Sequence, residues 1–393
     1  MVQLLLAVIY LSYISLGLPD AALGSAWPVM YGELGVPISS MGIISMIISA
    51  GTIVSSLLSD RLNRKLGTGL VTLFSVALTA LALLGFSLSH SFWLLCLIAI
   101  PYGLGAGSVD AALNGYVALH YASRHMSWLH CMWGIGAAAG PYLMGYALTG
   151  GVGWNSGYRY IAILQFALTA ILLLSLPLWK KTLPAAESSG GGQAIPLGRL
   201  LRLPGVPAAM LCFFCYCALE QCAGQWASSY LVLHKGVPEE TAASYASMFY
   251  LGITGGRALS GFLTIKFNDR KMIHMGELIL LLGVGAMLLP LGQTVSLVGL
   301  LLIGLGCAPV YPCIMHSIPE FFGAERSQAV MGLQTASASV GVLVMPPLFG
   351  LVANDIGVRW LPTVLLLILL LLGLSYERLC RRAGNHCGAA QSL

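Results

Sequence analysis

The chain has 393 residues, of which 58% are hydrophobic and only 8% are charged, with a formal net charge of +5. A soluble globular domain carries about 25% charged residues, so this chain has too little polar surface to fold in water. Hydrocarbon cannot hydrogen-bond an open backbone, and each segment that crosses it must therefore be a helix. The composition excludes a water-soluble fold and predicts an all-α polytopic membrane protein.

Apolar segments of about twenty residues, the length that crosses a bilayer, divide the chain into twelve predicted spans. The first segment lacks a basic leading region and a small-residue cleavage site, so we interpret it as a span rather than a secretory signal. The spans lie near residues 3–31, 38–59, 66–88, 91–119, 124–150, 157–179, 205–233, 240–265, 271–289, 294–318, 325–353 and 358–377.

The basic residues of the loops predict the orientation of the spans. Of the 19 Lys and Arg residues, Arg159, Lys235 and Arg359 fall in loops on one side, and Arg257 falls inside a span. All the others lie on the opposite side. Because basic loops stay in the cytoplasm, we expect a multi-pass protein of the cell inner (plasma) membrane with both termini cytoplasmic.

The one long connection, 180–204, is rich in Gly and Ser and is typical of a flexible linker. The segments on either side of it share three features in the same order: Asp20-x-x-x-Gly24 and Glu220-x-x-x-Gly224, Ser55-x7-Asn63 and Ser260-x7-Asn268, and Gly103-Leu104-Gly105 and Gly304-Leu305-Gly306. This duplication predicts an N-terminal six-helix half at 1–179, a C-terminal six-helix half at 205–377 and a cytoplasmic tail at 378–393. Parallel repeats of this kind place a substrate site near the membrane midplane, between the halves.

Five ionisable side chains fall well inside the predicted spans: Asp20, Asp110, His130, Glu220 and Arg257. An ionisable side chain at the centre of a membrane costs about 2.5 to 3.5 kcal/mol on insertion scales, so each of them marks a candidate functional site. Hydrogen bonding to a neighbouring helix is the structural alternative. No metal-spaced His cluster or phosphate-binding glycine loop accompanies them, so no metal is expected.

Asp20 shares one face of the first span with Tyr13 and Trp27. Pro19 removes a backbone donor directly before it and predicts a kink in the helix. A carboxylate beside a kink and an aromatic pair is expected to line a lumen-facing site for a proton and a ligand. A structural carboxylate bonded to an adjacent helix is the alternative.

On the fourth span, Asp110 and Asn114 are one turn apart and share a face with Gly103 and Gly107. Glycines at that spacing let another helix approach closely. Asp110 is therefore expected either to contact the solute or to be hydrogen-bonded across a tight helix contact.

The fifth and seventh spans carry two further candidate binding groups. On the fifth span, His130 and Trp133 are expected to be solute ligands, a proton relay or interhelical hydrogen bonders. The seventh span carries Glu220, Gln221, Gln225 and Trp226. Amides and carboxylates beside an aromatic ring recognise hydroxylated ligands, so this set is predicted to bind substrate, with polar packing between helices as the alternative.

Arg257 lies about nine residues, roughly 13 Å, above the cytoplasmic end of the eighth span. Asp110 and Asp60 are its candidate partners, in an ion pair that breaks and re-forms between the inward and outward states. Direct contact with the solute and snorkelling to the membrane surface are the alternatives.

Residues 59–65, Ser-Asp-Arg-Leu-Asn-Arg-Lys, resemble the loop motif of the major facilitator superfamily, whose core is Asp-Arg-x-Gly-Arg-Lys, although Asn63 replaces the glycine. Within that superfamily the chain is most similar to the fucose:proton symporter branch. This second resemblance rests on Gly17-Leu-Pro-Asp20-Ala-Ala-Leu-Gly24 with Trp27, Asp110-Ala-Ala-Leu-Asn114, His130-x-x-Trp133-Gly134-x-Gly136, Glu220 with Trp226, and Gly256-Arg257-x-x-Ser260-Gly261. The branch commonly has an asparagine three positions before the histidine, where this chain has Ser127.

The resemblance covers essentially the whole chain and implies a twelve-helix major facilitator fold in two pseudo-symmetric halves. It implies that Asp20 couples proton movement and that the acidic residue of the fourth span, here Asp110, binds the solute and relays protons. Glu220, as the second-half counterpart of Asp20, joins them as a predicted proton-coupling group. Asp60 and Arg61 are implied to latch the helices in one state, and with Arg257 they form the predicted conformational switch.

The sequence thus predicts a secondary active transporter, not an enzyme, that couples protons to the uptake of a small polar solute, a sugar or polyol, by alternating access. The proton is the coupling ion, and no other cofactor is expected. The expected partners are the solute and the lipid bilayer, without nucleic acid, and the protein is expected to be a monomer. Proton-driven export of hydrophobic or cationic compounds is the alternative, whereas a membrane enzyme or receptor has little support.

Overall fold

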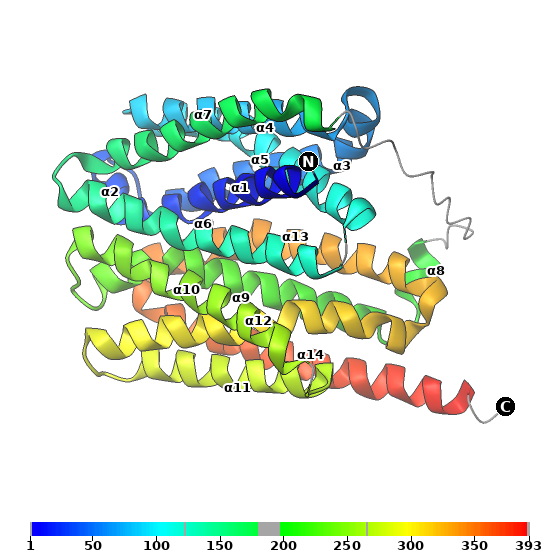
Figure 1. Ribbon diagram of the computed structural model, residues 1–393. Helices are drawn as coiled ribbons and strands as arrows, with labels where there is room; N and C mark the ends of the chain where they lie inside the picture. The colour runs from blue at the N-terminus through cyan, green and yellow to red at the C-terminus, as the bar shows by residue number, and fades with distance from the viewer. Residues whose placement is uncertain (1, 122, 180–196, 265, 391–393) are drawn as a thin grey trace.

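The computed structural model describes residues 2–121, 123–179, 197–264 and 266–390 (Figure 1). All regular secondary structure within these ranges is helical. The first part of the chain forms α1 (Val2–Asp20), α2 (Ala22–Glu33), the short 3-10 helix η1 (Ile38–Ser40), α3 (Met41–Leu66), α4 (Thr68–Leu88), α5 (Phe92–His120), α6 (Ser123–Thr149) and α7 (Gly153–Trp179). The protein is therefore an all-α polytopic membrane protein, as its composition predicts.

The second part begins with the short α8 (Leu197–Leu201), which falls in the predicted linker. It continues with α9 (Val206–Leu233), α10 (Glu239–Leu263), α11 (Asp269–Leu288), α12 (Gln293–Phe322), α13 (Ala324–Asp355), the 3-10 helix η2 (Val358–Trp360) and α14 (Leu361–Ala390). The last helix runs beyond the predicted end of span twelve, so most of the segment expected to be a tail is a continuation of α14. The rest of the predicted linker, 180–196, lies outside the described residues.

Ten of the long helical segments in the described ranges are long and apolar enough to cross a membrane. The predicted spans that do not meet this criterion are α6 and α10, which carry more polar residues. These two helices pack against each other along the middle of the bundle. Part of the surface of each therefore faces protein rather than lipid, and a lower hydropathy is tolerated there.

The helices form two groups that repeat one pattern of neighbours, with α1–α7 in the upper part of Figure 1 and α9–α14 in the lower part. In the first group α1 packs on α6, α3 on α5, and α4 on α7. In the second group the helices at the matching positions make the same pairs: α9 with α13, α10 with α12, and α11 with α14. An internal duplication would give this arrangement.

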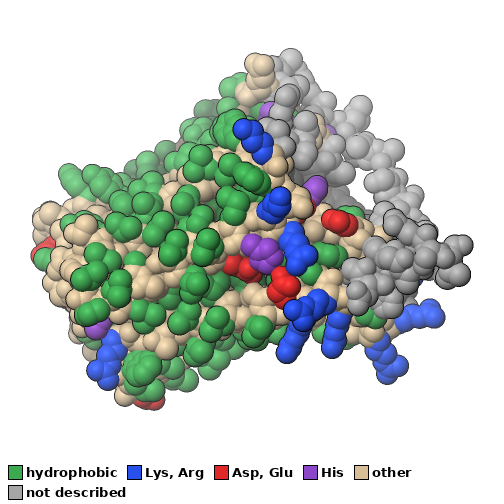
Figure 2. Space-filling view, turned by 90° about the horizontal axis from the view of Figure 1, so that it is seen from below, with side chains coloured by type: hydrophobic (Ala, Val, Ile, Leu, Met, Phe, Trp, Pro, Cys, Tyr) green, Lys and Arg blue, Asp and Glu red, His purple; other side chains and the backbone are tan. Residues whose placement is uncertain are grey.

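The face of the bundle seen in Figure 2 is mostly covered by hydrophobic side chains, and most of the visible Lys and Arg side chains gather toward the end where the two termini lie. A charged network between α11 and α14 lies among them. Arg270 contacts Glu377 at 3.3 Å, and the His274 ring contacts Glu277 at 3.0 Å and Glu377 at 3.3 Å. An apolar belt with a basic end is the surface expected for a protein held in a bilayer.

Glycines bring α1 and α6 into direct backbone contact at the centre of the N-terminal group. A methyl group added at Gly136 would meet the backbone of Ile14 and Leu18, and one at Gly17 would meet the backbone of Trp133. Small residues at such positions allow close helix packing where no hydrophobic effect drives association. This contact fixes the position of the fifth-span residues relative to α1.

We predict that Gly136→Ala destabilises the protein by about 1 to 3 kcal/mol, because the added methyl group must displace backbone. The matched control is Gly285→Ala on α11, where no atom lies within 4 Å of the added carbon. The control should be neutral or slightly stabilising, since alanine favours the helix. Thermal unfolding in detergent would measure both, and equal melting temperatures would contradict the packing described here.

Candidate functional site

A break in the first span presents a carboxylate inside the bundle. α1 ends at Asp20, Ala21 forms a turn, and α2 begins at Ala22, so the helix is interrupted where Pro19 predicts a kink. Pro19 and Ala21 are buried, yet Asp20 between them is exposed. An exposed carboxylate in the middle of a span indicates that water reaches the interior at this level.

Trp133 of α6 holds this carboxylate. Its indole Nε1 donates a hydrogen bond of 2.7 Å to Asp20 Oδ2. The Arg257 guanidinium of α10 lies over the same indole, 5.3 Å from the ring centroid, and the Tyr250 ring meets it edge-on at 6.5 Å. One aromatic side chain therefore separates a carboxylate of the first half from a cation of the second, in a contact worth about 0.5 to 2 kcal/mol.

The structure gives Arg257 an aromatic partner in place of the expected ionic one. Within the described residues, no carboxylate oxygen lies within 4.0 Å of its guanidinium, and it makes no hydrogen bond. Asp110, a predicted partner, is engaged elsewhere. The side chains of Asp60 and Arg61, the other predicted members of the switch, lie outside the described residues.

Asp110 belongs to a second polar group, which lies between helices of the N-terminal half. Its Oδ1 accepts hydrogen bonds from the Tyr13 hydroxyl at 2.9 Å and from Asn114 Nδ2 at 3.1 Å. The Tyr13 ring meets His130 edge-on, with centroids 6.0 Å apart. Tyr13 therefore links α1, α5 and α6, and Asp110 is hydrogen-bonded across a helix contact in this conformation.

The seventh-span group divides between the interior and the contact of the two halves. Glu220 is buried beside Tyr216. Gln225 Oε1 accepts a hydrogen bond from Ser45 of α3 at 3.0 Å, and Gln225 Nε2 donates to Gln221 Oε1 at 3.4 Å. Gln225 thus joins the two halves here and Gln221 is bonded to it on the same helix, whereas Glu220 is buried in the interior.

Trp27 and Trp226, predicted to form aromatic platforms for the solute, are packed inside the protein instead. Both are fully buried. Trp27 Nε1 donates to the Ile38 carbonyl at 2.7 Å, and Trp226 Nε1 donates to the Pro346 carbonyl at 3.1 Å. Each indole satisfies its polar atom on a backbone carbonyl, Trp27 on the 3-10 helix η1 and Trp226 on α13, so both side chains belong to the packing and Trp133 is the partly exposed indole beside Asp20.

The two halves are joined at the end of the bundle opposite the termini. Across the described chain, the hydrogen bonds between halves are from Ser228 Oγ to the Ser25 carbonyl at 3.3 Å, from Ser45 to Gln225, and from Thr149 Oγ1 to the Glu240 carbonyl at 3.4 Å. The other main contacts between halves, within the described residues, involve α2, η1, α3 and α6 with α9, α10 and α13. Because these described contacts gather at that end while Asp20 is exposed, we expect water to reach the interior that contains Asp20 from the end where the termini lie.

Two residues of the site carried a signal in the sequence that the prediction missed. Tyr250 lies two turns before Arg257 on α10, so it occupies the same helix face and meets the same indole. Tyr102 of α5 faces Asp20 from a third helix. Tyrosine is common in membrane spans, so only its spacing from an ionisable residue on the same helix could have marked these two positions as part of the site.

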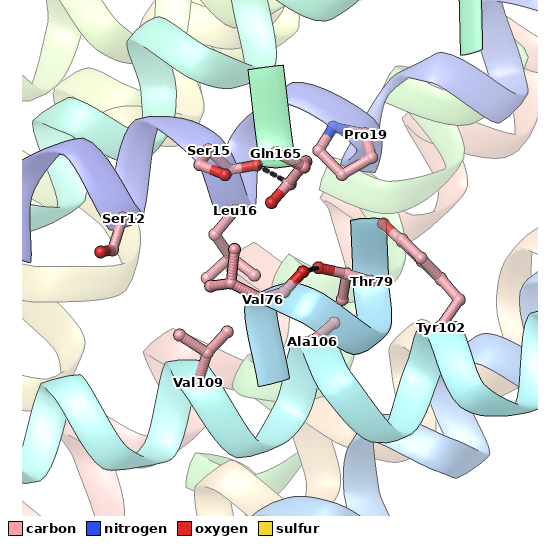
Figure 3. A pocket seen from close by; sticks show the side chains of 10 residues that line it. All are labelled: Ser12, Ser15, Leu16, Pro19, Val76, Thr79, Tyr102, Ala106, Val109 and Gln165. Atoms are coloured by element: carbon pink, nitrogen blue, oxygen red, sulfur yellow. Dashed lines mark hydrogen bonds between the residues drawn. The ribbon is translucent and has the colours of Figure 1, made fainter. Parts of the chain in front are cut away.

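A small polar cavity lies next to this site, inside the N-terminal group (Figure 3). It has a volume of about 10 Å³, space for roughly one water molecule. Gln165 Nε2 donates to the Ser15 carbonyl at 2.7 Å, while Gln165 Oε1 and Ser15 Oγ have no hydrogen-bond partner. Pro19 and Tyr102 also line it, so it adjoins the helix break at Asp20.

Comparison with known proteins shows to which family this protein belongs. The sequence matches the family described as Major Facilitator Superfamily over residues 9–327 and again over 209–382. The chain belongs to the major facilitator superfamily. It is therefore a multi-pass membrane transporter and not an enzyme.

Individual relatives are distant. The chain is 22% identical to "Bypass of stop codon protein 6" of Saccharomyces cerevisiae over 401 residues, covering 92% of this chain and 79% of that protein. It is 25% identical to "Probable nitrate/nitrite antiporter NarK1" of Thermus thermophilus over 213 residues, covering 49% of this chain and 47% of the other. Among solved structures, a bacterial homolog of the human lysosomal transporter Spinster, in an inward-facing and occupied conformation, matches with a TM-score of 0.73 at 14% identity over 97% of each chain.

The opening of the interior predicts a difference in chemical reactivity between two positions one turn apart. In a variant without native cysteines, Asp20→Cys should react with a membrane-impermeant thiol reagent at least tenfold faster than Ser25→Cys, because Asp20 is exposed and Ser25 is buried. The labelling should occur in everted vesicles, where the terminus side faces the reagent if the termini are cytoplasmic. Equal rates at the two positions would contradict an interior open to water.

Proposed function

We propose that this transporter couples the movement of protons to the uptake of a small polar solute, a sugar or polyol, by alternating access. The observation that carries the proposal is Asp20, a carboxylate at a helix break that faces the interior from the middle of a span. A low-dielectric environment disfavours the charged form of a carboxylate, and water favours it. A group whose surroundings change as the protein alternates between two states can therefore take up a proton on one side and release it on the other.

The groups around Asp20 support a hydroxylated solute. Carboxylates at Asp20 and Glu220 accept hydrogen bonds from hydroxyl groups, and Trp133 offers an aromatic surface against which a sugar ring packs. The likeness of residues 17–24 and 110–114 to the fucose:proton symporter branch points in the same direction. Asp110 and His130, joined through Tyr13, form a second polar group that would contribute once the helices move.

The excess of basic residues in the loops on the terminus side supports a cytoplasmic position for both termini. With both termini in the cytoplasm and the protein in the plasma membrane, the interior that contains Asp20 faces the cytoplasm. Uptake would then end in this state, with solute and proton released inward. Nothing in this cycle requires a second copy of the chain, and we propose a monomer.

Export of hydrophobic or cationic compounds is less well supported. Arg257 places a positive charge beside Trp133 with no carboxylate in contact, and a like charge on the cargo would be repelled by it. Acid-driven extrusion of a lipophilic cationic dye from cells that express the protein would favour this alternative over uptake.

Asp20→Asn should abolish accumulation of solute against a gradient while sparing counterflow exchange. The amide cannot carry a proton, but exchange needs only a neutral group at this position. The matched control is Asp355→Asn at the exposed end of α13, which should accumulate like wild type. Uptake and counterflow of a labelled solute in proteoliposomes would measure both activities. Full accumulation by the Asp20 variant would exclude this residue as the proton carrier.

A further inference from the structure

We infer that the transported solute carries a negatively charged group that binds to Arg257, which makes a hydroxylated carboxylate, such as a sugar acid, the preferred substrate class. This inference rests on the proposed function, because it specifies which small polar solute the same site takes. The feature that carries this inference is a cation inside the bundle that has no counter-ion in contact among the residues that the structure describes.

Arg257 lies on α10, well within the bundle, and is half buried. A charge in such a place is costly unless it is paired or hydrated. Its one close partner among the described residues is the face of Trp133, at 5.3 Å. A cation–π contact compensates for only part of the lost hydration of a guanidinium. The remaining donors of this side chain are therefore available to an anion.

Among the described residues, no negative charge is in contact with the Arg257 guanidinium. Glu220 and Arg257 both act electrostatically on Tyr216, Cys217 and Cys307, so the two charges lie near the same part of the interior, yet they do not come within 4.0 Å of each other. Two further side chains near Arg257, His130 and Cys131, supply no negative charge at neutral pH.

The geometry favours a carboxylate over a point charge. A guanidinium presents its donors in a planar fork that matches the two oxygens of a carboxylate. Trp133 lies against the guanidinium, with the Arg257 Cζ atom 5.3 Å from the ring centroid, and its indole is itself fixed by the hydrogen bond to Asp20. An anionic group would therefore meet the edge of Arg257. Hydroxyl groups on the same solute would reach the carboxylate oxygens of Asp20 or Glu220.

A neutral sugar would use the carboxylates and the aromatic surface but would leave the guanidinium uncompensated. A cationic solute would be repelled by it. Only a solute with both hydroxyl groups and an anionic group satisfies every polar feature of the site, and burying an unpaired charge is the most expensive alternative. Discrimination between a sugar and its acid should therefore be large.

The test uses the purified full-length protein and matched solutes: glucose with glucuronate, galactose with galacturonate, and glycerol with glycerate. At one pH and one ionic strength, isothermal titration should show the acid of at least one pair binding ten times more tightly or better, a difference of about 1.4 kcal/mol. Arg257→Gln should remove this preference, and Arg257→Lys should keep part of it, because an ammonium cannot reproduce the fork. Arg159→Gln, at an exposed position on α7, is the control and should bind like wild type.

Equal or tighter binding of the neutral member of every pair by the wild type would overturn the inference, as would a panel in which no acid binds. Retention of the full preference by Arg257→Gln would also overturn it. If that variant does not fold, the comparison of acid and neutral solutes with the wild-type protein still tests the inference. Binding of an acid without any associated proton movement would overturn the proposed proton coupling but leave this inference standing, so the two failures are distinguishable.

Discussion

The indole of Trp133 connects the two halves at the level where transport chemistry is expected. It donates to Asp20 on the first span and lies beneath Arg257 on the eighth. Both partners are charges that a membrane interior tolerates only when they are paired or hydrated. Because one side chain contacts both, a movement of α10 relative to α6 changes the surroundings of the carboxylate as well. In the proposed mechanism, this shared contact is a physical route that would link a rearrangement of the halves to the protonation of Asp20.

The fold supplies two further constraints on this site. Glycine contacts hold α1 against α6, so Trp133 keeps its place beside the helix break. Polar contacts that include Ser45 with Gln225 close the halves at the end opposite the termini. Such hydrogen bonds are individually modest, about 1 kcal/mol each, which suits a gate that must open and close. The described hydrogen bonds between the halves are thus few, whereas glycine contacts pack α1 closely on α6 within the first half.

Much of this arrangement could be predicted from the sequence, because the constraints on a membrane chain are severe. The interruption near Pro19 follows from its missing backbone donor, the short set of intramembrane charges from the cost of desolvation, and the two similar groups of helices from the matching segments on either side of the linker. The partners of those charges could not be predicted, since spacing along one helix does not specify which neighbouring helix lies opposite. Arg257 was expected beside Asp110, yet Tyr13 and Asn114 occupy that carboxylate. Trp27 and Trp226 have the composition of binding residues, but backbone carbonyls that only the fold brings near them fix them in the packing.

The central claim is that solute and proton move together through this interior. The most direct measurement follows the internal pH of proteoliposomes that contain the purified protein and a trapped pH-sensitive dye, with the membrane potential clamped. The solute of the panel that binds most tightly is added outside at equal pH. The account predicts that the lumen acidifies as labelled solute enters, and that protein-free liposomes show neither change. Entry of the solute with no change in internal pH would contradict it.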